Sequence, residues 1–348
     1  MVNAWSSELS KLVANAMLAQ RISSINTISA ICDKVGADID EVATAIGLDS
    51  RLGCKFLKAG LGFGGSCFKK DILSLVYLAQ SLHLIEVADY WMSILSINDF
   101  QQNRLITKVV TSLSGALVGK KIILLGYTFK QDTNDTRESP AIHIIEALLH
   151  ERPSEIAIYD PACSATEIKN NINNLIAATS LDVVTPNGPV EAYNNAYGAC
   201  EGSRAVLIVT PWKQFFPSQT RKETENHLSP VPSLQSIHHS RMSDIHETDI
   251  MNHGSHRRAS LTVQGHLALG NETNLPNHVV ERSICESKCF LCRDTANPAA
   301  SLQTHENIDW ARVATVMIEP KWVFDGRNIV DEESMTELGF RVVTILGR

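Results

Sequence analysis

The sequence predicts an α/β protein in which an all-helical region is followed by a doubly wound parallel sheet, with a long insertion of low order in the second part. Apolar residues recur at helical spacing up to about residue 115, and then gather in short runs that alternate with helical segments. A later stretch fits neither pattern. We therefore expect a helical domain over 1–115, a sheet domain over 116–212 plus 307–348, and an insertion over 213–306.

The helical region is expected to consist of long amphipathic helices separated by loops. Residues 5–31 carry apolar stripes at helical spacing, and Asp38 is a suitable N-cap for a short second helix. A loop then leads into a glycine cluster at 60–65, and helical spacing resumes after Cys67. Another long helix is predicted from Val87 to about Leu113.

The second part has the pattern of a Rossmann-like fold. Parallel strands are buried on both faces and therefore read as short continuous apolar runs. A helix should begin at Ser139 and Pro140, which suit the N-cap and first helical positions, and shorter helices are expected at 189–193 and 332–338. The predicted strands lie at 121–126, 155–160, 204–210, 322–325 and 341–346.

The insertion at 213–306 differs from the rest in composition. It holds nine of the twelve histidines, five of the twelve prolines and eleven serines, and it shows no sustained periodicity, so we expect little order there. Cys285, Cys289 and Cys292 have the spacing of a radical-type iron–sulfur site. No barrel pattern surrounds them, so we predict no metal site.

Composition excludes several classes of protein. The chain is 44% hydrophobic and 20% charged, as in ordinary globular proteins, and its net charge of −7 disfavours nucleic acid as a partner. There is no apolar run of membrane-spanning length, no secretory signal at the start, and eight cysteines are too few for a disulfide scaffold. We therefore expect a cytoplasmic protein that binds no membrane.

The glycine cluster satisfies the pattern G-x-G-x-x-G through Gly60, Gly62 and Gly65. No strand precedes it and no helix follows directly, so its context is wrong for a dinucleotide fingerprint. The better interpretation is a loop whose backbone approaches a ligand closely, because glycine lacks a Cβ and tolerates positive φ.

Cys67 is the first candidate for chemistry. It lies at the start of a predicted helix, where free N–H groups and Lys69 and Lys70 favour a thiolate, and Asp71 shares its helix face. This pattern is typical of a covalent catalyst, with a buried structural cysteine as the alternative.

Lys11 and Asn15 lie one turn apart on a stripe that continues with apolar residues. A lysine on a half-buried stripe needs a partner such as a bound anion or a developing oxyanion. The alternative is a lysine whose stem lies along the helix edge while its ammonium stays in water.

Four segments resemble signature segments of the UDP-glucose/GDP-mannose dehydrogenase family. Over residues 3–80 the sequence most resembles the eukaryotic members of the family that oxidise UDP-glucose. The segments are 3–15 and 62–71, which resemble the central domain, and 126–139 and 324–328, which resemble the C-terminal domain. The resemblance covers roughly 1–212 and 307–348.

The resemblance implies oxidation of the C6 hydroxyl of UDP-glucose to a carboxylate with two NAD⁺, through a cysteine thiohemiacetal and then a thioester that water hydrolyses. It implies that Cys67 is the nucleophile, that Asp71 helps to activate water, and that Lys11 and Asn15 stabilise the oxyanion. It also implies a homo-oligomer formed through the central domain, in which Arg51 reaches the substrate of a neighbouring subunit. The remaining implied substrate-binding residues are Lys58, Ala59, Gly60, Leu61, Gly62, Phe63, Gly64, Phe129, Lys130 and Arg327. The implied NAD-side residues are Cys67, Phe68, Lys69, Lys70 and Arg137.

The sequence departs from the family at its start, because the resemblance begins after the family's N-terminal NAD-binding domain. We therefore expect this chain alone to be an incomplete dehydrogenase. The alternative function is an inactive truncated paralogue that binds a UDP-sugar or pairs with a full-length subunit.

Overall fold

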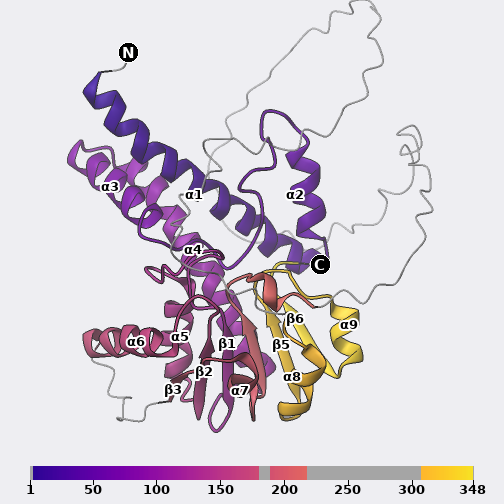
Figure 1. Cartoon of the computed structure of the whole chain (residues 1–348). Coiled ribbons are helices and arrows are strands. Elements are labelled where there is room, and N and C mark those ends of the chain that lie inside the picture. Colours follow the sequence, from indigo (N-terminus) through magenta and orange to yellow (C-terminus); the bar gives the residue numbers. More distant parts are fainter. Residues whose placement is uncertain (1–2, 180–188, 218–306, 348) are drawn as a thin grey trace, which may run out of the picture. The chain divides into compact units, whose positions relative to one another are not determined.

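The structure is a computed structural model that describes residues 3–179, 189–217 and 307–347. Its first part is helical, with α1 (Ala4–Val35), α2 (Ile39–Gly47), α3 (Phe68–Ser81) and α4 (Ile85–Ser112) (Figure 1). Asn3 caps α1 by accepting the Ser6 N–H at 2.8 Å, and Gly36 ends that helix at φ 74°.

The second part contains a six-stranded parallel sheet in the order β3-β2-β1-β4-β5-β6. This order is that of a doubly wound Rossmann-like sheet. Strands are added in one direction from β1 to β3 and in the other from β4 to β6, so the order reverses between β1 and β4. The strands are β1 (Lys121–Leu125), β2 (Glu155–Tyr159), β3 (Val190–Ala192), β4 (Ala205–Ile208), β5 (Lys321–Asp325) and β6 (Phe340–Thr344).

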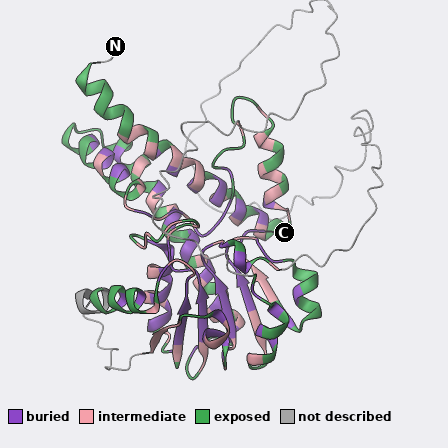
Figure 2. Cartoon of the chain, viewed as in Figure 1, coloured by how far each residue is buried: buried purple, intermediate pink, exposed green. Residues whose placement is uncertain are grey.

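Helices cover both faces of the sheet because alternate strand residues are buried on opposite sides. Ile122 and Leu124 of β1 pack in one cluster with residues of α4, α5 and α6, whereas Ile123 and Leu125 pack in a second with residues of α7, α8 and α9 (Figure 2). The helices are α5 (Pro140–His150), α6 (Ala165–Thr179), α7 (Ala196–Cys200), α8 (Trp310–Val316) and α9 (Glu332–Glu337), with a 3₁₀ turn η1 (Lys213–Phe215).

Helix α4 contributes to two hydrophobic cores. Its Ile94 packs with Ala16 of α1 and Ile72 of α3, while its Leu105 and Val109 belong to the cluster under the sheet. Ile25 and Cys32 of α1 and Ile39 of α2 belong to the same cluster, so three helices fix the helical region against the sheet, with the loop between α2 and α3 at their boundary.

The predicted fold class is confirmed: a helical region precedes a parallel doubly wound sheet. The short helix expected at 189–193 is wrong, because Val190–Ala192 forms the edge strand β3 in register with β2. Tyr193 donates its N–H to Ile158 O at 2.9 Å, so pairing with the sheet decides the conformation of so short a segment. Helix α6 was not predicted.

The low order expected over 213–306 is wrong for its first residues, because Lys213–Phe215 forms η1 and Phe215 is fully buried in the core. Residues 218–306 of that insertion lie outside the described residues. The same holds for Cys285, Cys289 and Cys292. Among the helices that the structure describes, none has the length and apolar character needed to cross a bilayer.

Candidate active site

The glycine loop at 60–65 lies where the helical region meets the sheet, and its glycines are required by close protein neighbours. Gly62 has φ +90°, and a Cβ there would overlap Oδ1 of Asn98. A Cβ on Gly64 would overlap the carbonyl oxygen of Glu138. The sequence suggested close approach to a ligand, but at these two positions the approach to other parts of the chain already explains glycine.

Buried side chains hold the backbone of this loop. Asn98 accepts the Phe63 N–H at 2.8 Å and donates to Phe63 O at 3.2 Å. Asn26 accepts the Gly60 N–H at 2.9 Å, and Gln101 donates to Gly60 O at 2.8 Å. A loop fixed at both N–H and C=O of Gly60 and Phe63 is a rigid platform rather than a free surface loop.

Cys67 occupies the N-cap of α3 and is exposed, with a free thiol. Its side chain makes no capping hydrogen bond, and Ser66 Oγ lies 4.0 Å from its Sγ. The alternative of a buried structural cysteine is therefore wrong. The exposed thiol lies at the start of a 14-residue helix, at the positive end of the helix dipole.

Asp71 lies one helical turn beyond Cys67 and is only 1% exposed. It accepts a hydrogen bond from Asn15 Nδ2 at 2.6 Å and another from Lys70 Nζ. Burial alone would raise the pKa of Asp71, but the hydrogen bonds from Lys70 and Asn15 and the charges of Lys70 and Lys11 hold that pKa below its ordinary value. The structure thus brings Cys67, Asp71 and Asn15 together.

Lys11 differs from its sequence interpretation in one respect. The helical stripe suggested a half-buried ammonium, whereas Lys11 is exposed because this end of α1 extends beyond the packed core (Figure 2). It still acts on Asp71 through its charge. Desolvation therefore gives no reason for a lysine here.

Positive groups surround Cys67 on its outer side. Arg137 pairs with Asp135 at 2.8 Å, and Lys69 pairs with Glu138 at 2.7 Å. The hydrogen bond to Asp135 is the main cause that raises the pKa of Arg137, and the hydrogen bond to Asp71 is the main cause that raises the pKa of Lys70. The charge of Cys67 raises both pKa values further. Lys69, Lys70, Arg137 and Glu138 line an open cavity of about 810 Å³, a size within the range of small-molecule sites.

Phe68, predicted on the cofactor side, packs edge-on against Phe63 with ring centroids 5.6 Å apart. It is half-buried at the margin of the helical core. Its ring therefore packs the loop onto α3, and its role toward the cofactor stays a prediction.

Arg327 follows β5 and reaches the glycine loop from the sheet side. A Cβ on Gly60 would lie 2.8 Å from its Nη1, and its Nε donates to Val209 O. Desolvation lowers the pKa of Arg327 to about 10 despite the nearby charge of Asp325. Asp325 is fully buried and accepts the N–H groups of Arg327, Ile329 and Val330 at 2.7–2.8 Å, which fixes the turn that carries Arg327.

Phe129 also meets the loop from the sheet side. A Cβ on Gly65 would lie 3.0–3.2 Å from atoms of its ring, and Lys130 Nζ lies 5.7 Å from the ring centroid. Phe129 and Arg327 therefore flank the glycine loop. That they bind one substrate, as the resemblance implies, stays a prediction.

Some predicted residues lie elsewhere. The Arg51 side chain is 87% exposed and pairs with Asp49 at 2.5 Å, and Lys58 is exposed. Ala59 and Leu61 have buried side chains in the core, so these two can offer a ligand only their backbone. Gly326 packs directly on Leu61, since a Cβ there would lie 2.6 Å from Leu61 Cδ1.

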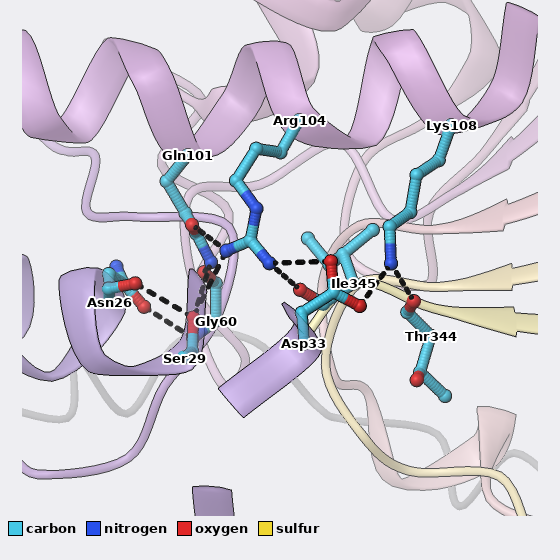
Figure 3. A network of polar contacts seen from close by, with 9 residues as sticks. All are labelled: Asn26, Ser29, Asp33, Gly60, Gln101, Arg104, Lys108, Thr344 and Ile345. Atoms are coloured by element: carbon cyan, nitrogen blue, oxygen red, sulfur yellow. Dashed lines mark hydrogen bonds and ion pairs between the residues drawn. The ribbon is translucent and has the colours of Figure 1, made fainter. Parts of the chain in front are cut away.

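Sequence reasoning missed the buried polar residues that hold the loop. Asn26, Asn98 and Gln101 lie on the buried faces of α1 and α4, among apolar residues and a few other polar ones. A polar side chain on a buried stripe was the available signal, because such groups must find partners. Figure 3 shows the part of this network that surrounds Gly60.

The fold and this site define a two-part protein: a Rossmann-like sheet whose carboxyl edge faces a helical region that carries an exposed cysteine. The chain belongs to the UDP-glucose/GDP-mannose dehydrogenase family. The family model of the central domain matches residues 5–100, and that of the UDP binding domain matches residues 123–230, together more than half of the chain.

The chain is similar to curated UDP-glucose 6-dehydrogenases. It is 47% identical to that of Caenorhabditis elegans over 213 residues, which are 61% of this chain and 43% of the relative, and 49% identical to that of Bos taurus over 213 residues, 61% of this chain and 42% of the relative. The chain thus spans less than half the length of these relatives.

Solved structures show the same fold. A UDP-glucose dehydrogenase from the hyperthermophilic archaeon Pyrobaculum islandicum is 29% identical with a TM-score of 0.50, over 60% of this chain and 44% of that one. The NDP-N-acetyl-D-galactosaminuronic acid dehydrogenase from Methanosarcina mazei Go1 is 14% identical with a TM-score of 0.59, over 99% of this chain and 52% of that one, and shares the fold.

Proposed function

We propose that this chain carries the cysteine-bearing and UDP-sugar-binding parts of an NAD-dependent UDP-glucose 6-dehydrogenase, which oxidises UDP-glucose to UDP-glucuronate in two steps. The observation that carries the proposal is Cys67, exposed at the start of α3 beside Asp71, Asn15 and Lys70. The names of the similar proteins support the substrate. In this proposal residues 1–115 form the catalytic and dimerising domain, and 116–212 with 307–348 form the UDP-binding domain.

Cys67 is the proposed nucleophile. Its thiolate adds to the aldehyde-level C6 carbon to give a thiohemiacetal. Loss of a second hydride from C6 gives a thioester, and attack by water then releases the carboxylate and the Cys67 thiolate. Asn15 and Lys11 supply the donors for the oxyanion that develops on that carbon. Asp71, held ionised by Lys70 and Asn15, orients the attacking water and keeps these donors in place.

NAD⁺ would accept hydride from C6 when bound. The cavity next to Cys67 offers donors from Lys69, Lys70 and Arg137 to one side of an anionic dinucleotide, and each of these side chains is also paired with a carboxylate. The glycine loop does not fit as a phosphate cradle. No strand precedes it among the described residues, and the space beside Gly62 and Gly64 is filled by Asn98 and Glu138. This chain thus contributes side chains toward the cofactor, whereas the phosphate cradle is not found among the described residues.

UDP-glucose is proposed to lie along the glycine loop, between Lys58–Gly64 and the sheet residues Phe129, Lys130 and Arg327. Positive side chains suit the diphosphate, and the backbone of a rigid loop suits the hydroxyls of the sugar. Arg51 is exposed and pairs with Asp49, outside the glycine loop. It is proposed to bind the substrate of a second copy in a homo-oligomer.

A second candidate function is a UDP-sugar-binding subunit without turnover. The sequence leaves this alternative open. Titration calorimetry with UDP-glucose tests binding, and NADH absorbance after addition of NAD⁺ tests turnover. Binding with Cys67-dependent NADH formation supports the enzyme, binding alone supports the subunit, and no binding overturns both.

Cys67→Ser is the matched variant for these measurements. The substitution removes the nucleophile while leaving an N-cap side chain of similar size. We expect it to bind UDP-glucose as the wild type does and to show no sustained NADH formation, because capture of the aldehyde-level carbon requires the thiolate. Light scattering at several concentrations checks the proposed oligomer.

A further inference from the structure

A polar network joins the C-terminal segment of the chain to the glycine loop, and Arg104 on α4 is its centre (Figure 3). Arg104 Nη2 donates to Ile345 O at 2.6 Å and pairs with Asp33 Oδ2 at 3.2 Å. Its Nη1 donates to Gln101 Oε1 at 2.7 Å. One side chain thus bonds to the end of the sheet region, to α1 and to a neighbour on its own helix.

Lys108 reinforces the same junction one turn further along α4. Its Nζ pairs with Asp33 Oδ1 at 2.6 Å and donates to Thr344 O at 2.8 Å. Asp33 is therefore shared by two cations, and each cation also holds a carbonyl of the C-terminal segment. Gly347 lies so close to α1 that a Cβ on it would be 2.7 Å from Cys32 Cβ, which fixes this segment further.

Arg104 determines which way the Gln101 amide points. A guanidinium has only donors, so the amide atom that faces it must be the oxygen, and Nε2 is then directed at Gly60 O, 2.8 Å away. Gln101 is fully buried, so no exchange with bulk water replaces this bond. Asn26 holds the Gly60 N–H at 2.9 Å, and Gly60 is thereby fixed at both ends.

Gly60 in turn forms the wall against which Arg327 lies, since a Cβ at Gly60 would be 2.8 Å from Nη1 of that arginine. We infer that Arg104 and Gln101 are positioning residues of the sugar-nucleotide site, and that the C-terminal segment at Ile345 sets the position of the glycine loop through them. The identity of the ligand rests on the proposed function, whereas the control of the loop does not.

Gln101→Glu is the sharpest test. A glutamate keeps the size of the side chain and still accepts from Arg104, but it offers no donor to Gly60 O. We expect faster amide hydrogen exchange in peptides covering 57–65, and a Kd for UDP-glucose raised roughly tenfold for the loss of one buried hydrogen bond at the site. Gln80→Glu, exposed on α3, introduces the same charge and should change neither quantity.

Arg104→Lys is the second variant, because it tests the same contacts without placing a carboxylate at the buried position 101. A lysine keeps the positive charge beside Asp33 but has a single nitrogen in place of two that bond in different directions. We expect the same local exchange signature. Thermal unfolding of each variant separates this local change from general loss of stability.

Unchanged exchange at 57–65 in both variants overturns the inference, and so does an increase spread evenly over all peptides, which means only general loosening. Faster exchange confined to 57–65 with wild-type UDP-glucose affinity overturns the link to the ligand site. If the wild type binds no UDP-glucose, the proposed function fails, while exchange of the unliganded protein still decides whether Gln101 and Arg104 position the loop.

Discussion

Asn15 on α1 donates a hydrogen bond from its Nδ2 to Oδ2 of Asp71 on α3, with 2.6 Å between the atoms. The two residues are 56 positions apart in sequence, so the bond joins two separate helices. Asp71 is only 1% exposed. A buried carboxylate needs donors to remain charged, and Asn15 is one of the two side chains that supply them. The bond therefore has consequences for stability as well as for the proposed chemistry.

Asn15→Ala should lower the free energy of unfolding by about 1–3 kcal/mol, because a buried acceptor loses a charged hydrogen bond. Urea unfolding followed by circular dichroism measures it. Asn170→Ala, on an exposed position of α6, should change stability by less than about 0.5 kcal/mol. Equal effects of the two substitutions would contradict the importance of the bond.

Two carboxylates predict the response to acid. Burial opposes ionisation of Asp71 and Asp33, but Lys70 with Asn15, and Lys108 with Arg104, hold both pKa values below the ordinary range. A folded pKa below the unfolded one means that the unfolded state binds more protons. Stability is then fully present above the unfolded pKa of about 3.9 and falls as pH drops through the lower folded values.

We therefore expect the urea concentration at the unfolding midpoint to decrease once the pH is lowered below about 4. The variants Asp71→Asn and Asp33→Asn should start from lower stability at neutral pH and lose less of it on acidification. Asp132→Asn, at an exposed position, serves as the control. Parallel curves for the wild type and both buried variants would show that these carboxylates do not carry the acid sensitivity.

The buried turn after β5 gives a third prediction. Asp325 accepts three backbone N–H groups, from Arg327, Ile329 and Val330, and is fully buried. Asp325→Ala leaves these donors without their acceptor and should cost about 3 kcal/mol or more. The release of Arg327 should also weaken UDP-glucose binding, which calorimetry measures at a temperature where the variant is folded. Wild-type stability would contradict this account of the turn.

The cysteines should separate by burial and chemistry. Cys67 and Cys54 are exposed, whereas Cys32, Cys163 and Cys200 are buried, and burial raises the pKa of both Cys163 and Cys200 to about 12. Among the five cysteines that the structure describes, iodoacetamide at neutral pH should therefore label Cys67 and Cys54 before the three buried ones, because the thiolate is the reactive form. Mass spectrometry of the labelled peptides gives the order. Early labelling of Cys163 or Cys200 in the folded protein would contradict it.

Local patterns in the sequence predicted much of this structure. The spacing of four between Cys67 and Asp71 places them on one helix face in any α-helix, and continuous apolar runs such as 122–125 indicate buried parallel strands. The β3 edge strand could not be predicted in this way, because three residues carry too little pattern and their conformation comes from pairing with β2.

The support of the glycine loop was also beyond local pattern. Asn98 bonds to Phe63 and Gln101 to Gly60 across separations of 35 and 41 positions, and no sequence rule links such residues without the fold. The same is true of the glycines. Sequence shows that a close approach is tolerated at 62 and 64, but only the packed structure shows that Asn98 and Glu138 make that approach.

Gly62 allows this distinction to be tested against a matched glycine. Gly62 (φ +90°) and Gly202 (φ +71°) both have positive φ, so alanine is strained at either position. A Cβ at Gly202 has nothing within 4 Å, whereas one at Gly62 would overlap Asn98. Gly202→Ala should therefore cost about 1 kcal/mol for backbone strain alone. Gly62→Ala should cost a further 1–3 kcal/mol, roughly, for the steric overlap.

Asn98→Ala in the Gly62→Ala background separates the two contributions, because it removes the atom that the new Cβ would meet. If overlap causes the excess, the cost of Gly62→Ala measured in the Asn98→Ala background should fall toward that of Gly202→Ala. Chemical denaturation of the four proteins gives this coupling. Equal costs of Gly62→Ala in both backgrounds would mean that the left-handed backbone, and not the contact with Asn98, is what requires glycine at position 62.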